Sequence, residues 1–452
     1  MKIIIVGCGK IGSTIARELN DEGHHIVVID KNPQAVENLT GSIDIMGITG
    51  NGTSFEILQE AEIENADLII AVTGADELNI YCCLLARSAG VRHTIARVRN
   101  PEYTKDLPRI KDILGLSLSI NPELICAREM DRLLKFPGAI EIDTFAKGVV
   151  ELIKISVPEN SFLSNVQVKS TAHFFKGKVR ICTVERNGET FIPNGDFVIH
   201  SDDKISLLAS SSDATKILKK LGLLSSRSRS VVILGGSKTA FYLADYLIRA
   251  GVKVKIIEKN KERCEVLAER LHDAVIINGN CMDLDLMTAE GVENASGIVA
   301  LMNNDEENIL ISLYLRKISD AKIITKINNE SFGSIVDSLK LDSIINPKHL
   351  AGEQIAKYVR SMQNSLGSSV ETLYHISENN DVEALEFRVK EDSWVTGIPL
   401  KDLKLKDNLQ IACINRNGRI IRPSGLDTIE LHDTVIVVTK HTGLSKLEDI
   451  LK

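Results

Sequence analysis

No apolar run in this sequence is long enough to cross a membrane. A membrane helix needs about 18 consecutive apolar residues, and the 452-residue chain contains no such stretch. The apolar start at residues 1–6 is ended by Gly7, Gly9 and Lys10. It is therefore shorter than the apolar region of a signal peptide, which has about 7 to 15 residues. We expect neither a membrane span nor a secretion signal, and the start of the chain is predicted to form a buried strand.

Cysteine and histidine are present but too scattered for a disulfide framework or a metal site. The eight cysteines make no C-x-x-C pair, and the ten histidines make no H-x-x-H or H-x-x-x-H pair. Several cysteines lie within apolar patterns, where an unpaired cysteine behaves as a small hydrophobic residue. This usage is typical of a reducing compartment. We therefore expect a cytoplasmic protein without a metal site.

Clusters of basic residues are missing as well. The formal net charge is -7, and the chain has no Lys/Arg-rich run of the kind that follows a phosphate backbone. A nucleic-acid partner is therefore not expected. The length of 452 residues predicts about two to four domains rather than one core.

What the sequence does contain is an internal repeat. Residues 5–32 (IVGCGKIGSTIARELNDEGHHIVVIDKN) align with residues 233–260 (ILGGSKTAFYLADYLIRAGVKVKIIEKN). Each segment has an apolar strand, a glycine turn, an amphipathic helix, and a second strand that ends in an acidic residue and Lys-Asn. Residues 71–79 and 300–308 also correspond. Such self-similarity indicates one structural unit per copy.

A second pair of segments repeats after the first. Asn-Gly pairs at 187–188 and 417–418 lie between alternating apolar runs, which predicts a two-residue type I′ hairpin in each copy. The polar pairs at 202–203 and 432–433 are interpreted as solvated turn residues. The order along the chain is therefore a strand–helix unit, a small β-rich unit, and then both again.

Breaks in composition divide the chain further. Residues 225–230 and 363–369 are predicted linkers, and a weaker break lies at 136–138. We predict nucleotide-binding domains at 1–136 and 229–364, and small domains at 140–224 and 368–452. The fold class is α/β, with two Rossmann-like parallel-sheet domains, each followed by a small α+β, β-rich domain.

Residues 123–134, just before the weaker break, have apolar side chains at helical spacing. This amphipathic helix packs either on its own domain or against a neighbouring subunit. The pattern indicates that this helix packs against an apolar surface, but it does not show which one.

The first glycine turn lies between a strand and a helix, the context that makes G-x-G-x-x-G informative. In residues 7–12 (GCGKIG), Gly7 permits the tight turn, Gly9 lets a pyrophosphate approach, and Gly12 allows close helix–strand packing. The helix N-terminus offers N–H groups and a positive dipole end to phosphates. Asp30, which ends the next strand, is expected to accept hydrogen bonds from ribose hydroxyls. The turn therefore predicts a site for NAD(H), or for ATP, ADP or AMP, which share the same ribose diol.

Two loops and a basic residue complete the predicted site. Asn51 and Gly52 follow a third predicted strand and are expected to face the adenine. Thr73 and Gly74 follow the next strand and would lie beside the ribose and phosphates. Arg97 ends a further strand and is a candidate phosphate partner.

The second copy departs from this pattern. Gly235 and Gly236 keep the turn, but Ser237 adds a side chain where a pyrophosphate would approach. Glu258 keeps the ribose-binding acid, and Lys326 stands where the first copy has its basic residue. The sequence leaves open whether this copy binds a nucleotide, binds it more weakly or takes another ligand.

A glycine turn of this kind also serves dehydrogenases and other sensors. A dehydrogenase needs an acid or base beside the nicotinamide, but His173 and His200 in the first small unit have no counterparts in the second. A duplicated unit is more typical of a symmetric sensor than of one active site. A nucleotide sensor for a different cation transporter remains an alternative.

With these motifs in view, the chain resembles the TrkA regulatory subunits of Trk-type potassium uptake systems. These are built from two tandem RCK units, each a Rossmann-like N domain followed by a small C domain. The resemblance covers essentially the whole chain. It is carried by the GCGKIG turn with Asp30, by residues 47–54 (GITGNGTS) and 71–79 (AVTGADELN), and by the repeated Asn-Gly module.

The resemblance implies a function as well as a fold. It implies a cytoplasmic, non-enzymatic subunit on the inner face of the membrane, attached to an integral potassium-conducting partner and assembled as a homotetrameric ring. NAD(H), or ATP and ADP, would bias the ring between conformations. The implied cofactor-binding residues are Gly7, Cys8, Gly9, Lys10, Ile11, Gly12, Asp30, Asn51, Gly52, Thr73, Gly74 and Arg97 in the first copy, and Gly235, Gly236, Ser237, Lys238, Thr239, Glu258 and Lys326 in the second.

Overall fold

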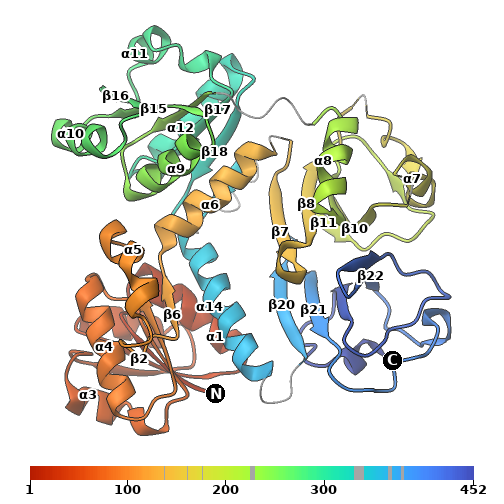
Figure 1. Cartoon of the computed structure of the whole chain (residues 1–452), viewed down its shortest axis with the longest axis horizontal. Coiled ribbons are helices and arrows are strands. Elements are labelled where there is room, and N and C mark those ends of the chain that lie inside the picture. The colour runs from red at the N-terminus through yellow and green to blue at the C-terminus, as the bar shows by residue number, and fades with distance from the viewer. Residues whose placement is uncertain are drawn as a thin grey trace.

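The computed structural model describes residues 1–136, 138–159, 161–175, 177–223, 230–329, 339, 341–364, 369–377 and 381–452. The linker predicted at 225–230 lies almost entirely outside these residues, as do residues 365–368 of the second linker and residue 137 of the weaker break. Within the described chain, the predicted fold class is confirmed: two parallel sheets alternate with two smaller antiparallel units (Figure 1).

The first parallel sheet has six strands in the order β3-β2-β1-β4-β5-β6. The chain adds β2 and β3 on one side of β1 and then β4, β5 and β6 on the other side. In sheets of this order, a ligand crevice opens at the strand ends between the two central strands, here β1 and β4. Its central strands are apolar because helices cover both faces of the sheet. The elements are β1 (Lys2–Val6), α1 (Lys10–Asp21), β2 (His25–Asp30), α2 (Pro33–Thr40), β3 (Met46–Thr49), α3 (Phe55–Glu60), β4 (Leu68–Ala71), α4 (Asp76–Ser88), β5 (His93–Arg97), α5 (Pro101–Ile110), β6 (Leu118–Ile120) and α6 (Pro122–Lys135).

The second parallel sheet repeats this order as β16-β15-β14-β17-β18-β19. The agreement confirms the internal duplication that the aligned segments predict. Its elements are β14 (Ser230–Leu234), α9 (Lys238–Arg249), β15 (Lys253–Glu258), α10 (Lys261–Arg270), β16 (Ala274–Asn278), α11 (Leu284–Ala289), β17 (Gly297–Ala300), α12 (Asp305–Ile318), β18 (Lys322–Lys326), β19 (Ser343–Ile345) and α14 (Pro347–Asn364).

Each small unit contains a five-stranded antiparallel sheet. The first sheet has the order β11-β10-β13-β8-β7, and the second β20-β21-β24-β22-β23. The first unit comprises β7 (Glu141–Phe145), β8 (Val150–Ser156), β9 (Val166–Gln167), α7 (Val168–Phe174), β10 (Arg180–Arg186), β11 (Glu189–Phe191), β12 (Val198–Ile199), β13 (Lys204–Ser210) and α8 (Ser211–Lys220). The second has β20 (Val370–His375), β21 (Glu383–Arg388), β22 (Leu409–Arg416), β23 (Arg419–Ile421) and β24 (Thr434–Thr439).

Both predicted hairpins are present, between β10 and β11 and between β22 and β23. Asn187 and Gly188 have φ of 53° and 80°, and Asn417 and Gly418 have 52° and 84°. A type I′ turn requires positive φ at both central residues. The prediction from the Asn-Gly pairs is therefore confirmed.

The polar pairs of the small units are only partly what the sequence suggests. Asp202 and His432 are exposed, but Asp203 and Asp433 are buried, so the interpretation of the second residue as solvated was wrong. Asp203 accepts two hydrogen bonds of 2.7 Å from the Arg186 guanidinium, and Asp433 is paired in the same way with Arg416. The carboxylates are buried because a hairpin arginine folds back over each of them.

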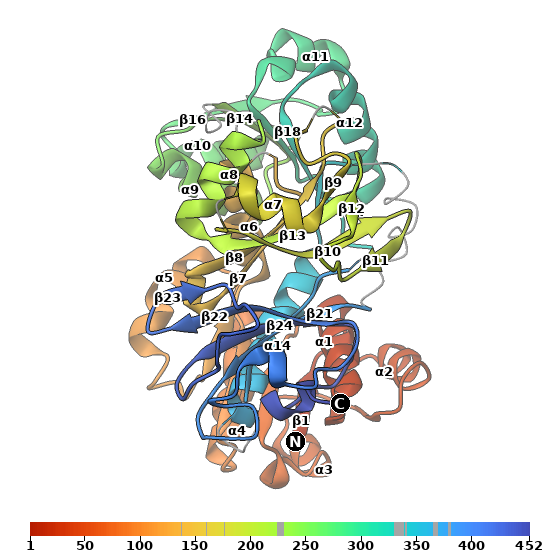
Figure 2. The ribbon, with the colours of Figure 1, turned by 90° about the vertical axis from the view of Figure 1, so that its right-hand side faces the viewer.

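The amphipathic helix α6 touches its own domain through Ile125, but it packs mainly on the second half of the chain, a surface not considered from the sequence. It lies against α9 of the second half. In turn, α14 of the second half extends to the first half and packs on α1 (Figures 1 and 2). Met130 of α6 shares a core with Leu243 and Leu247 of α9. The two crossing helices thereby hold the halves of one chain together.

The small units also contact each other. The ring of Phe145, at the end of β7, meets the ring of Tyr374 in β20 edge-on, with centroids 5.1 Å apart. The amide of Ala146 donates to the Glu386 carboxylate across the same boundary at 2.9 Å. Both rings are buried, so the two halves are joined at their small units as well as at their helices.

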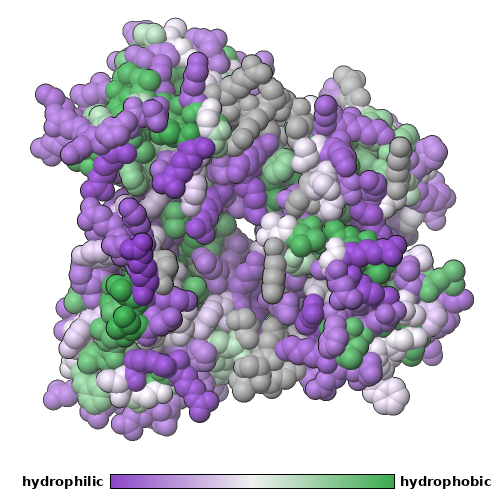
Figure 3. Space-filling model, viewed as in Figure 1, coloured by the Kyte–Doolittle hydropathy of each residue, from purple (hydrophilic) through white to green (hydrophobic). Residues whose placement is uncertain are grey.

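All eight cysteines are buried and unpaired, as the apolar patterns around several of them predict. Burial raises the pKa of the Cys8 thiol to about 12, so this group is unreactive near neutral pH. No described helix combines the length and apolar character that a membrane span needs. Hydrophilic residues cover most of the face in Figure 3, and apolar residues gather in smaller areas.

A charged contact joins α1 to α14. His349 lies between two carboxylates, with Nδ1 3.5 Å from Glu18 Oε1 and Nε2 3.3 Å from Glu353 Oε1. The hydrogen bond to Glu18 and the negative charge of Glu353 raise the pKa of His349 to about 9. The imidazole is therefore protonated at neutral pH and attracts α14 to α1.

This contact predicts a pH-dependent stability. Because the folded pKa of about 9 lies above the ordinary value of 6.5, the stabilisation is complete below pH 6.5 and is lost as pH rises to 9. The side chain is half-exposed, so we expect a contribution of only about 1 kcal/mol. Urea unfolding of the wild type and His349→Gln should differ by this amount at low pH and converge above pH 9. A difference that stays constant with pH would contradict the assignment.

Candidate nucleotide site

The first glycine turn opens into a cavity of about 840 Å³. The cavity lies at the carboxyl ends of the parallel strands, where α/β sheets bind ligands, and its volume is in the range of small-molecule sites. Predicted residues that the structure brings together in its wall are Gly7, Gly9, Lys10, Ile11, Asp30, Asn51, Gly52, Thr73, Gly74 and Arg97. Cys8 and Gly12 are buried behind this wall.

The three glycines have different surroundings. Gly7 has φ of 110°, a conformation that favours glycine. A Cβ on Gly12 would lie 1.8 Å from the Gly7 carbonyl oxygen, so only hydrogen fits between α1 and the turn. A Cβ on Gly9 would meet nothing within 4 Å. The backbone at Gly9 is therefore open on the side from which a pyrophosphate would approach.

Asp30 is held at the edge of the cavity by two backbone amides. Its Oδ2 accepts from the Cys8 amide at 2.6 Å, and its Oδ1 accepts from the Asn32 amide at 2.9 Å. A carboxylate oxygen has a second lone pair, so both oxygens keep capacity to accept from a ribose diol. The same contacts tie the acid to the glycine turn and fix the distance between the two.

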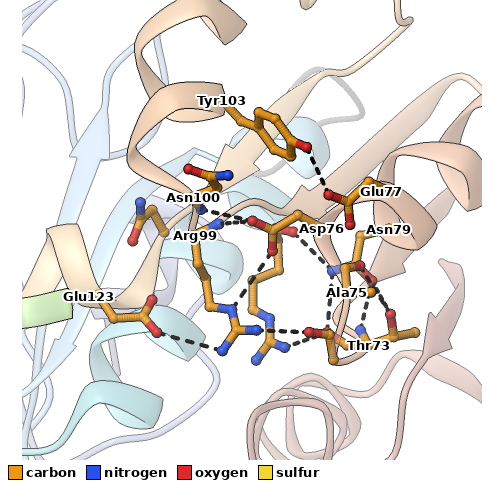
Figure 4. Close-up of polar contacts among 12 residues, drawn as sticks. Thr73, Ala75, Asp76, Glu77, Asn79, Arg99, Asn100, Tyr103 and Glu123 are labelled. Atoms are coloured by element: carbon orange, nitrogen blue, oxygen red, sulfur yellow. Dashed lines mark hydrogen bonds and ion pairs between the residues drawn. The ribbon is translucent and has the colours of Figure 1, made fainter. Parts of the chain in front are cut away.

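Arg97 lies against the loop after β4 (Figure 4 shows the neighbouring contacts of that loop). Its guanidinium donates to the Thr73 carbonyl oxygen, and the Asn79 side chain bridges Thr73 and the Arg97 carbonyl at 2.7 and 2.9 Å. Burial, and next the charge of Arg99, lower the pKa of Arg97. A nearby anionic ligand would stabilise the charged form of this guanidinium.

Three charged residues that sequence reasoning missed stand beside Arg97. Arg99 donates to the Gly74 carbonyl at 2.8 Å and lies 3.7 Å from Asp76 and 3.8 Å from Glu123 (Figure 4). Asp76 also accepts from the backbone amides of Arg99 and Asn100, each at 2.8 Å. Its place in AVTGADELN, at the start of α4, was the available signal. The network fixes the loop that carries Thr73 and Gly74.

The first cavity is also lined by the second half of the chain. Ser237, Lys238, Thr239, Lys326 and Lys348 belong to its wall. Thr239 and Lys326, which the sequence predicts for the second site, line the first cavity, and Lys326 also donates to the carbonyl of Leu301 in the wall of the second cavity at 3.3 Å. α9 packs against α6 of the first half, which places the start of α9 beside the first cavity.

A second cavity of about 1160 Å³ opens at the second glycine turn. Its wall includes the predicted residues Gly235, Gly236, Ser237, Lys238 and Glu258, together with Lys10 from the first half. Glu258 accepts from the amides of Gly236 and Asn260 at 2.6 and 2.8 Å, as Asp30 does in the first copy. The acid and its turn are therefore preserved.

The phosphate end of the second cavity differs. The Ser237 hydroxyl accepts from the Ala240 amide at 3.3 Å and caps α9. Arg263 donates to the Gly236 carbonyl at 2.6 Å and covers the turn from the other side. A ligand at this helix start thus meets a hydroxyl and a guanidinium, whereas the first copy presents the bare backbone of Gly9.

The two cavities also differ in charge. The wall of the first contains seven Lys or Arg side chains and two carboxylates, whereas the wall of the second contains five of each. The excess of positive charge in the first cavity attracts phosphate groups, whereas the equal numbers of positive and negative side chains in the second cavity do not. Lys10, Lys238 and Lys348 line both cavities, so the two sites share a boundary.

The fold defines a protein of two tandem Rossmann-like modules, each followed by a small antiparallel unit. The same architecture is found in the GsuK channel bound to NAD, with 17% identity, a TM-score of 0.63, and coverage of 97% of this chain and 76% of that chain. The GsuK structure bound to ADP has 16% identity, a TM-score of 0.52, and coverage of 80% and 69%.

Sequence comparison identifies the family. The TrkA-N domain matches residues 3–122 and 231–347, and the TrkA-C domain matches residues 152–222 and 384–452. The Trk system potassium uptake protein TrkA homolog of Archaeoglobus fulgidus is 31% identical over 453 residues and covers 100% of both chains. TrkA of Halomonas elongata is 30% identical over 448 residues, covering 97% of this chain and 93% of its own. This chain belongs to the TrkA family of Trk potassium uptake systems.

Proposed function

We propose that this chain is the cytoplasmic regulatory subunit of a Trk-type potassium uptake system. NAD(H), or ATP and ADP, binds in the N domains and controls a membrane-embedded potassium-conducting partner. The observation that carries the proposal is the first cavity, with its excess of positive charge beside Asp30 and the open backbone of Gly9. Such a cavity suits an adenine nucleotide with at least two phosphates.

The shared walls suggest how binding acts on the rest of the chain. A nucleotide in the first cavity touches Gly9 and Asp30 of one half and Lys238 and Lys348 of the other. It therefore favours the relative orientation of the halves that lets both sides make contact, and it shifts the population towards that orientation. We propose that four such chains form a ring on the inner face of the membrane and pass this change to the partner.

We propose a sensor rather than a dehydrogenase. The full-length relatives named above are potassium uptake proteins, and GsuK structures of this fold hold NAD or ADP. The second cavity, with balanced charge and a capped helix start, is proposed to bind a nucleotide more weakly or to take a different ligand.

Thermal unfolding of the purified full chain with NAD⁺, NADH, ATP and ADP tests the proposal. A ligand that binds the native state at about 100 times its Kd stabilises it by about 2.7 kcal/mol. We expect a clear rise in Tm with at least one of the four, and the largest rise names the ligand. No rise with any of them would contradict the nucleotide proposal.

A further inference from the structure

A buried tyrosine connects the second glycine turn to the first cavity. Tyr242 lies in the first two turns of α9, the helix that begins at the second turn, and its side chain is 7% exposed. Its hydroxyl accepts from Asn121 Nδ2 at 3.0 Å and donates to the Arg99 carbonyl oxygen at 3.2 Å. Both partners belong to the first half of the chain.

The two partners of Tyr242 position the first cavity. The side chain of Arg99 lines that cavity and holds the Gly74 carbonyl. Asn121 caps α6, because its Oδ1 accepts from the Leu124 amide at 3.0 Å. The next residues along, Pro122 and Glu123, belong to the cavity wall. A displacement of α9 is therefore felt at two points of the first site.

We infer that Tyr242 is a positioning residue that couples the two cavities through its hydroxyl. This inference rests on the proposed function, since it requires a nucleotide in the first cavity. In the first copy the corresponding position is Thr14, which has a shorter side chain and whose hydroxyl donates to the Lys10 carbonyl of its own helix.

Packing alone does not need this hydroxyl. The ring of Tyr242 stacks edge-on against Phe241, with centroids 5.7 Å apart, and Tyr242→Phe keeps the ring. Tyr246, one turn further along α9, offers a matched control because its hydroxyl accepts from Arg128 Nε at 2.9 Å on the exposed side of the same interface. Removing either hydroxyl deletes a contact between α9 and the first half, and of the two it is the Tyr242 hydroxyl that donates to a residue of the first cavity's wall, Arg99.

Hydrogen exchange on the full chain tests the inference. All samples carry Glu258→Gln, which removes the carboxylate of the second cavity and keeps a side-chain oxygen that can accept from the backbone, and are measured with and without saturating NADH. Residues 7–12 report direct binding, and residues 259–266, several of which line the second cavity, report the distant effect. We expect NADH to slow exchange at 259–266 by about fivefold, the equivalent of one hydrogen bond. Tyr242→Phe should abolish this slowing, and Tyr246→Phe should keep it.

The outcomes separate the inference from the proposed function. No slowing at residues 7–12 would count against nucleotide binding itself. Slowing at 7–12 with none at 259–266, or a distant effect that survives Tyr242→Phe, would overturn the role of Tyr242. Asn121→Ser is a second variant for the case in which Tyr242→Phe unfolds, because a serine can still cap α6 and is too short to keep the side-chain hydrogen bond to Tyr242. It should also abolish the distant effect.

Discussion

Replacing Asp30 with alanine should weaken binding of NADH to the first cavity by about 10- to 100-fold. A hydrogen bond to a charged group contributes about 1.5–3 kcal/mol, so this range corresponds to the net loss of one bond between the carboxylate and the ribose diol. Its two amide partners, Cys8 and Asn32, also hold the acid to the turn. Fluorescence titration of NADH measures the change.

The second copy provides a matched control for this substitution. Glu258 accepts from the Gly236 and Asn260 amides as Asp30 accepts from the Cys8 and Asn32 amides. Glu258→Ala therefore removes the same backbone contacts from the other half of the chain. It should leave NADH affinity at the first cavity within about fivefold of the wild type. Equal losses of NADH affinity in the two variants would show that Asp30 supports binding by stabilising the fold and not by contacting the ribose.

Replacing Gly12 with valine should destabilise the first N domain by about 3 kcal/mol or more. The Cβ would lie 1.8 Å from the Gly7 carbonyl oxygen and 3.3 Å from Val72, and the obstructing oxygen is backbone that cannot rotate away. Relief requires α1 to move off β1, which opens the apolar core around Ile15 and Leu19. The lowered Tm of the full chain is the readout.

Gly9→Ala is the contrasting variant for the same turn. No atom lies within 4 Å of a Cβ at Gly9, so the Tm should stay close to that of the wild type while NADH affinity falls. In the second copy, Ala240 occupies the position of Gly12 and is accommodated. A normal Tm for Gly12→Val would show that the first turn can open in the same way.

The features that sequence reasoning predicted are local ones. The Gly7 and Asp30 geometry follows from a strand, a turn and a helix that are adjacent in the chain. The positive φ of Asn187 and Asn417 follows from two-residue hairpins between alternating strands. The same signals occur in both copies of the repeat, and the strand orders agree in both halves.

The features that sequence reasoning missed depend on how distant segments meet. An apolar stripe on α6 shows that the helix needs a partner, but not that the partner is α9 of the other half. For the same reason, the sequence does not show that Thr239 and Lys326 line the first cavity. The burial of Asp203 and Asp433 depends on an arginine 17 residues away that folds back. The domain boundaries at 136, 224 and 364 stay predictions.

Equilibrium dialysis with radiolabelled NADH tests nucleotide binding most directly. The number of NADH molecules bound per chain is measured for the wild type and for the double variant Asp30→Ala, Glu258→Ala, with circular dichroism to check that both are folded. We predict that NADH saturates at one or more molecules per wild-type chain, and that the double variant needs about 10- to 100-fold more NADH to reach the same occupancy. A folded wild type that binds no NADH, or a double variant that binds as tightly as the wild type, would contradict NADH binding at these two acids.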